Sequence, residues 1–68
     1  MSRTYKIIEV VGTSNESYED AINSAIKSAS KTLKALSWFE VVQMRGGIKD
    51  GKVEEYQVIL KVGFKILD

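Results

Sequence analysis

The C-terminal part of the chain contains the feature that constrains the fold most, a run of strict alternation from Glu54 to Leu67. Every second position of this run is apolar, and the positions between are mostly charged or polar. The apolar positions are Tyr56, Val58, Leu60, Val62, Phe64 and Ile66. Because successive side chains of a strand point to opposite sides, this period of two predicts a strand with one apolar face. At ~3.3 Å per residue the strand would extend roughly 45 Å.

Two further strands and one helix are predicted in the rest of the chain. Residues 5–11 are rich in β-branched side chains and stop at a glycine, and residues 38–45 are a second strand candidate. Between them, apolar positions spaced by three and four predict an amphipathic helix from Tyr18 to Leu36, with Ser17 as its N-cap. Residues 46–52 contain Gly-Gly and Asp-Gly pairs, which predict the loop of a hairpin.

The order strand, helix, strand, strand determines the topology. A helix crossover makes the first two strands parallel if they share a sheet, and a hairpin makes the third strand antiparallel to the second. Placing the long apolar strand in the centre makes every neighbouring pair antiparallel. The predicted fold is therefore an α+β protomer of β-α-β-β order, with a three-stranded antiparallel sheet in the order 1-3-2 and one helix packed on one face.

The small size of the chain predicts self-assembly. Its 68 residues form a single domain, residues 1–68, which buries only about 60% of the surface that the unfolded chain exposes. Without Cys or His, the chain cannot use disulfides or Cys/His zinc sites for extra stability. The second face of the sheet, expected to carry Trp38, Val42, Met44 and Ile59, has no cover within the chain. We therefore expect a large homo-oligomer in which this face meets other copies.

Charge and residue usage exclude several classes of function. Ten Lys and Arg against nine Asp and Glu leave a net charge of +1, too little for a nucleic-acid partner to be expected. Thiol and Ser-His-Asp catalysis are excluded within one chain, and no carboxylate pair indicates acid–base catalysis, so we do not expect an enzyme. No apolar run approaches the ~20 residues of a membrane span. No secretory signal is visible at the N-terminus, so a cytoplasmic location is expected.

Three side chains are candidates for ligand binding. Trp38 and Gln57 are expected on the uncovered face, because Phe39 and Tyr56 point to the helix. Trp38 is either an interface anchor or a stacking platform for a planar ligand, to whose edge Gln57 would offer a donor and an acceptor. Arg45 is either a solvated charge beside a turn or a planar cation for a phosphate or a ring. Strict alternation places Arg45 on the helix side with Phe39, unless a bulge near the glycines reverses it.

Together these residues resemble the dodecins, a family of small flavin-binding proteins. The resemblance covers nearly the whole chain and rests on short motifs that agree in order and spacing. They are Val11-Gly12-Thr13-Ser14 leading to Ser17, Trp38-Phe39-Glu40-Val41, Arg45-Gly46, Glu55-Tyr56-Gln57-Val58 and Val62-Gly63-Phe64. The resemblance implies a hollow homododecamer with cubic symmetry, in which flavins bind as stacked pairs at two-fold interfaces.

The resemblance also implies roles for the three candidate residues. Trp38 matches the family tryptophan that covers the isoalloxazine face, and Gln57 matches the glutamine that hydrogen-bonds its pyrimidine edge. Arg45 matches a basic position that bacterial members use near the FMN ribityl and phosphate, which favours FMN over riboflavin or lumichrome. Some bacterial relatives also hold coenzyme A near a three-fold axis, and no residue here is assigned to such a site. The implied role is flavin storage and photoprotection, and the alternative is a structural or nucleic-acid-binding oligomer without flavin.

Overall fold

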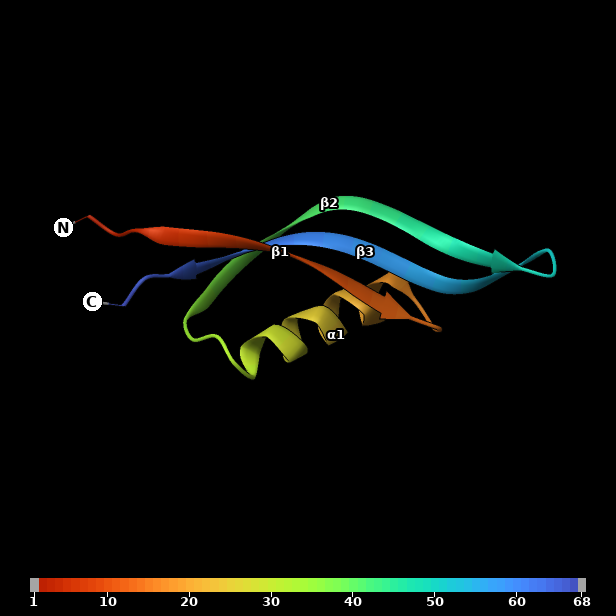
Figure 1. Cartoon of the computed structure of the whole chain (residues 1–68), viewed down its shortest axis with the longest axis horizontal. Coiled ribbons are helices and arrows are strands. Elements are labelled where there is room, and N and C mark those ends of the chain that lie inside the picture. The colour runs from red at the N-terminus through yellow and green to blue at the C-terminus, as the bar shows by residue number, and fades with distance from the viewer. Residues whose placement is uncertain (1, 68) are drawn as a thin grey trace.

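The computed structural model describes residues 2–67 and contains four elements in the predicted order (Figure 1). They are β1 (Tyr5–Ser14), α1 (Tyr18–Ser30), β2 (Leu36–Lys49) and β3 (Lys52–Lys65). The strands form one antiparallel sheet in the order β1-β3-β2. The helix α1 lies along one face of this sheet (Figure 1). The predicted α+β fold, element order and 1-3-2 strand order are therefore confirmed.

The start of α1 is fixed by two serines and an aspartate. Ser17 is the N-cap, as predicted, and its hydroxyl accepts a hydrogen bond of 2.9 Å from the backbone N–H of Asp20. Ser14, at the end of β1, donates its hydroxyl to Asp20 Oδ2 at 2.7 Å and accepts the backbone N–H of Glu16 at 2.9 Å. These bonds join the end of β1 to the first turn of α1, so the polar groups of this segment form hydrogen bonds within the chain.

The predicted C-terminal end of the helix is wrong. The helix stops at Ser30 rather than at Leu36, and with 13 residues it is neither long nor apolar enough to cross a membrane. Serine and threonine alternate with other residues from position 28 to 32, and such side chains compete for backbone hydrogen bonds. Ser30, for example, donates its hydroxyl to the carbonyl of Lys27 at 2.8 Å. Leu36 still packs on the core, but as the first residue of β2.

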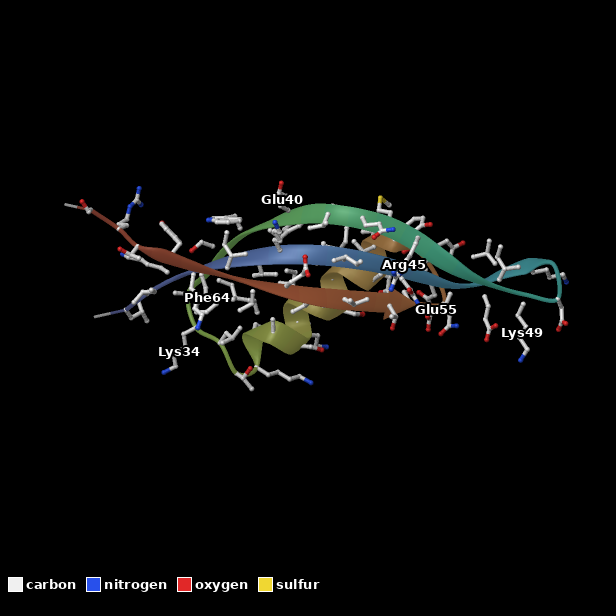
Figure 2. The ribbon with its side chains drawn as sticks, turned by 45° about the horizontal axis from the view of Figure 1, so that its top comes forward. Lys34, Glu40, Arg45, Lys49, Glu55 and Phe64 are labelled. Atoms are coloured by element: carbon white, nitrogen blue, oxygen red, sulfur yellow. The ribbon has the colours of Figure 1, made fainter. Side chains whose placement is uncertain are left out.

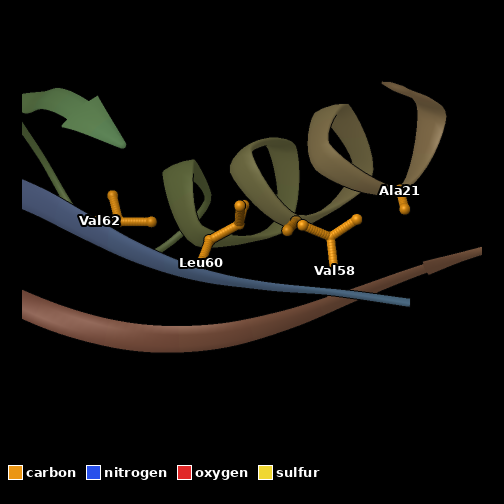
Figure 3. Packing of buried hydrophobic residues seen from close by; sticks show 5 residues of the cluster. Ala21, Val58, Leu60 and Val62 are labelled. Carbon is orange, nitrogen blue, oxygen red and sulfur yellow. The ribbon is translucent and has the colours of Figure 1, made fainter. Parts of the chain in front are cut away.

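The hydrophobic core lies between α1 and the central strand (Figure 3). Val58, Leu60 and Val62 project from β3 and are fully buried, as the alternation of this segment predicts. Ala21 and Ala25 of α1 pack against them. Because alanine has only a methyl side chain, the helix axis can lie close to the sheet. The sheet face that α1 covers is therefore the face on which the core residues of β3 lie.

Gly12 lies inside β1 and does not end it, contrary to the prediction. The strand continues through this residue to Ser14. A Cβ atom at position 12 would lie only 2.1 Å from the backbone carbonyl oxygen of Ala21. Glycine is therefore required here because β1 and α1 approach each other closely, and not because the chain turns.

The hairpin between β2 and β3 is tighter than predicted. The strand β2 continues through Gly46 and Gly47, and the turn consists of Asp50 and Gly51 alone. Their φ angles of 54° and 75° fit a two-residue type I′ turn, for which Asp-Gly is a favoured sequence. A Cβ at Gly46 would lie 2.9 Å from the carbonyl oxygen of Glu55, so this glycine allows close strand packing instead of a turn.

The helix covers only part of one sheet face. It packs mainly against β1 and β3, so the residues of β2 that point to the helix side remain open, with Phe39 49% and Met44 50% exposed. The molecule is 54 Å long, whereas a 13-residue helix spans only ~20 Å. The hairpin end of the sheet therefore extends beyond α1, opposite the end that holds both chain termini (Figure 1).

Candidate functional site

A β-bulge in β2 decides which side chains reach the open face, which is the sheet face that α1 does not cover. The pairing of β2 with β3 shifts by one residue at Val42, which has no partner. An extra residue in one strand reverses the faces of all residues that follow it. As a result, Met44 lies opposite Val58 on the helix side, and Arg45 lies opposite Gln57 on the open face.

This bulge corrects two predictions from the sequence. The prediction that Met44 lies on the uncovered face is wrong, because the bulge turns it to the helix side. The strict alternation that places Arg45 on the helix side is wrong for the same reason. The shift in pairing that reverses Arg45 lies at Val42, whereas the shift beside the glycines, between Gly47 and Ile48, comes after Arg45 and does not change its face.

Trp38 lies on the open face, as predicted, and its indole ring covers Gly63 of β3. The two residues are paired in register, and a Cβ at position 63 would lie 2.2 Å from the indole. The ring therefore lies close to the backbone of the central strand, in space that any larger residue would occupy. The side chain is 41% exposed. A flat aromatic side chain held in this way can stack on a planar ligand.

Gln57 also lies on the open face, as predicted, and it lies between two charged side chains. Arg45 Nε donates a hydrogen bond of 2.7 Å to Gln57 Oε1, and Gln57 Nε2 donates one of 2.6 Å to Glu55 Oε1. Figure 2 shows Arg45 and Glu55 in the same part of the sheet, near the hairpin end. From the sequence, Glu55 is a candidate, with Glu9 and Glu40, for salt bridges between strands or subunits. Its position two residues before Gln57 on one strand places both on one face.

The structure does not bring Trp38 and Gln57 together within one chain. Trp38 lies opposite Gly63, and Gln57 is six residues away from Gly63 along the same strand. At ~3.3 Å per residue this separation is roughly 20 Å. A charged row, in which Lys61 is paired with both Glu9 and Glu40, crosses the sheet between them. Trp38 and Gln57 therefore lie in separate parts of the open face.

The fold and these side chains define a small α+β chain. Its open sheet face carries an exposed tryptophan and a glutamine that is hydrogen-bonded to an arginine and a glutamate. The dodecin family matches residues 4–67. The chain is 52% identical over 66 residues to the dodecin of Thermus thermophilus, covering 97% of this chain and 96% of the relative. The chain belongs to the dodecin family, which confirms the resemblance inferred from its motifs.

Solved dodecin structures agree closely with this fold. The dodecin of Streptomyces coelicolor superposes with a TM-score of 0.94 at 48% identity, covering 97% of this chain and 94% of that one. The dodecin of Streptomyces davaonensis superposes with a TM-score of 0.96 at 44% identity, and the match covers 100% of both chains. Dodecins are small flavin-binding proteins of twelve subunits, known for binding rather than catalysis. The roles of Trp38, Gln57 and Arg45 in this chain remain predictions.

Proposed function

We propose that this protein binds FMN between the subunits of a hollow homododecamer, and that it stores and protects the flavin without turning it over. The separation of Trp38 from Gln57 is the observation that carries the proposal. Both lie on the open face, yet roughly 20 Å of strand lies between them. That distance exceeds the length of a flavin ring system, so one flavin can meet both groups only where two chains come together.

The proposed ligand contacts follow from the chemistry of each side chain. Trp38 stacks on the isoalloxazine ring, and a two-fold axis brings a second flavin and a second tryptophan onto the same stack. Gln57 offers an acceptor and a donor to the edge of the ring that carries the N3–H group and its two carbonyls. Neither contact requires a proton to move, which is consistent with binding without turnover.

The position of Arg45 supports FMN as the preferred flavin over riboflavin or lumichrome. The bulge at Val42 turns this guanidinium to the same face as Gln57. A guanidinium carries five N–H donors, of which the bond to Gln57 uses one, so further donors can meet a phosphate. Among flavins of this group only FMN carries a phosphate, and such charge-assisted contacts are stronger than neutral ones.

Exposed apolar surface on both sides of the sheet supports the homododecamer. On the open face, Ile7 is 51% and Val11 is 53% exposed. On the helix side, a groove of about 560 Å³ lies between α1 and β2, where Ile22, Ile26 and Phe39 contribute to its lining. A monomer would leave these surfaces in water, whereas a closed shell would cover both.

The first experiment is to identify the small molecule that the purified protein carries. A yellow protein with quenched flavin fluorescence, whose extract has the absorption spectrum and mass of FMN, supports the proposal. A colourless protein that does not quench added FMN contradicts it and favours a structural or nucleic-acid-binding oligomer. The same mass analysis tests whether coenzyme A is bound, and fractionation of producing cells tests the proposed cytoplasmic location.

A further inference from the structure

Gln57 is held at both ends by groups of opposite charge. Its carbonyl oxygen accepts from the Arg45 guanidinium at 2.7 Å, and its amide nitrogen donates to the Glu55 carboxylate at 2.6 Å. A glutamine amide has two lone pairs on its oxygen and two hydrogens on its nitrogen. Each end is therefore used once, and each retains one further site for a ligand.

The two charges also exclude the opposite orientation of the amide. If it were flipped, its NH₂ group would face the N–H groups of Arg45, and its carbonyl would face the carboxylate of Glu55. Both contacts would be repulsive, because two donors and then two acceptors would meet. The order of donor and acceptor that Gln57 presents is therefore fixed before any ligand arrives.

We propose that Glu55 is a positioning residue which, with Arg45, fixes the direction of the Gln57 amide and so the position at which the flavin N3–H group is bound. This inference rests on the proposed function. The carbonyl on the Arg45 side accepts the flavin N3–H, and the amide on the Glu55 side donates to a neighbouring ring carbonyl. Because a carbonyl lies on each side of N3–H, either one can accept from this amide, so the fixed amide determines where the N3–H group is bound rather than which way the ring faces.

The local backbone supports a positioning role for Glu55. Glu55 lies on the same face as Gln57 because the two residues are two positions apart in β3. Opposite Glu55 in β2 is Gly47, which has no side chain, and a Cβ there would lie 3.8 Å from Glu55 Cβ. No larger neighbour across the strand therefore displaces the carboxylate from the amide of Gln57.

Lumiflavin is the probe that isolates this effect, because it has the ring edge of FMN and no phosphate. We expect Glu55→Ala to weaken lumiflavin binding about threefold to tenfold, the range for one lost hydrogen bond. Glu55→Gln should largely retain binding, because its amide carbonyl can still accept from Gln57 Nε2. Glu54→Ala is the matched control, since it removes the same charge from the adjacent residue, whereas the amide of Gln57 donates to Glu55.

Two further binding measurements separate positioning from general damage. In a Gln57→Leu background, Glu55→Ala should cause no additional loss of lumiflavin binding. With an N3-methylated lumiflavin, which lacks the donor for the Gln57 carbonyl, the loss on Glu55→Ala should shrink. Equal binding of lumiflavin by wild type and Glu55→Ala, or an equal loss in Glu54→Ala, would overturn the inference and leave the proposed function standing.

A ligand-free measurement keeps the inference testable even if no flavin binds. The chain has two glutamines, so the side-chain NH₂ signals of Gln57 can be assigned by their loss in Gln57→Leu. We expect one of these protons to resonate far downfield, because it donates to a carboxylate, and to move upfield in Glu55→Ala. Unchanged signals in Glu55→Ala would contradict the positioning role, whereas absence of flavin binding by the wild type would contradict the proposed function alone.

Discussion

Trp38 is either a stacking platform for flavin or an interface anchor, and its replacement by alanine distinguishes the two roles. Its ring covers Gly63 and remains 41% exposed in one chain. If that exposed face stacks on flavin, Trp38→Ala should weaken FMN binding by ~1–3 kcal/mol, the stacking range known for nucleobases on aromatic side chains. The oligomer should survive, because other apolar residues still cover the interface. Fluorescence titration with FMN measures the loss, and unchanged affinity would make Trp38 an interface anchor only.

Replacing Gln57 and replacing Arg45 should reduce flavin affinity in different ways. Gln57→Leu leaves polar atoms of the ring edge unpaired, which costs ~1–3 kcal/mol and should affect FMN, riboflavin and lumichrome alike. Arg45→Ala should weaken FMN more than riboflavin, because only FMN carries a phosphate, and high salt should narrow the difference. Quenching titrations of both variants with FMN and riboflavin measure these effects. Equal losses for the two flavins in Arg45→Ala would reject the phosphate contact.

At the residue scale, the sequence predicts faces only where the strand is regular. Gln57 follows from alternation, since β3 pairs with β1 without interruption, and Trp38 follows because the pairing of β2 is regular from Trp38 to Val41. Arg45 does not follow, because Val42 is a β-branched residue that fits a regular strand as well as a bulge. The sequence indicates Glu55 only as a salt-bridge candidate, because its contact with Gln57 is one that alternation alone does not reveal.

The packing of α1 on β1 depends on the absence of a side chain at Gly12. In Gly12→Ala the new Cβ would lie 2.1 Å from the carbonyl oxygen of Ala21, so the helix must move away from the sheet. We expect the free energy of unfolding to fall by ~1–3 kcal/mol, the usual cost of overpacking. Gly47→Ala is the control, because its Cβ would meet Glu55 Cβ at an ordinary 3.8 Å. Urea unfolding of both variants measures the difference, and equal stability would contradict this packing.

At the element scale, the kind and order of elements could be predicted from periodicity, and their ends could not. The apolar spacing continues to Leu36 because this residue packs on the same core from β2, so the pattern does not mark the end of α1. Glycines caused the other errors. Gly12 and the Gly46-Gly47 pair look like turn signals. In the structure, however, Gly12 and Gly46 permit close packing inside strands. Asp50-Gly51 alone forms the turn.

The whole molecule has more apolar surface than one helix can cover, and Phe39 tests what that surface does. Phe39 points to the helix side of β2 but is 49% exposed, so a charge there should not unfold an isolated chain. In the proposed shell the same residue would lie between subunits, where a lone carboxylate is costly. Phe39→Asp should therefore reduce the mass measured by light scattering while the circular dichroism of the fold remains. An unchanged mass would show that the surface around Phe39 is not part of the subunit interface.

At this scale, assembly stays a prediction of the sequence, which rests on a sheet too long for the one helix to cover. The sequence could not predict that Trp38 and Gln57 lie in separate parts of the open face. Their distance depends on the register in which β2 pairs with β3, including the position of the bulge at Val42. In that register roughly 20 Å of strand separates the two groups within one chain, which is more than the length of a flavin ring system.

Sedimentation velocity of the protein with FMN, recorded at a visible wavelength that only flavin absorbs, tests whether flavin is bound between the subunits of a dodecamer. Such binding predicts that flavin absorbance moves with a species near twelve times the 7.6 kDa of one chain, with about one flavin per chain. Flavin that sediments with a folded monomer, or that stays unbound beside the dodecamer, would contradict the account.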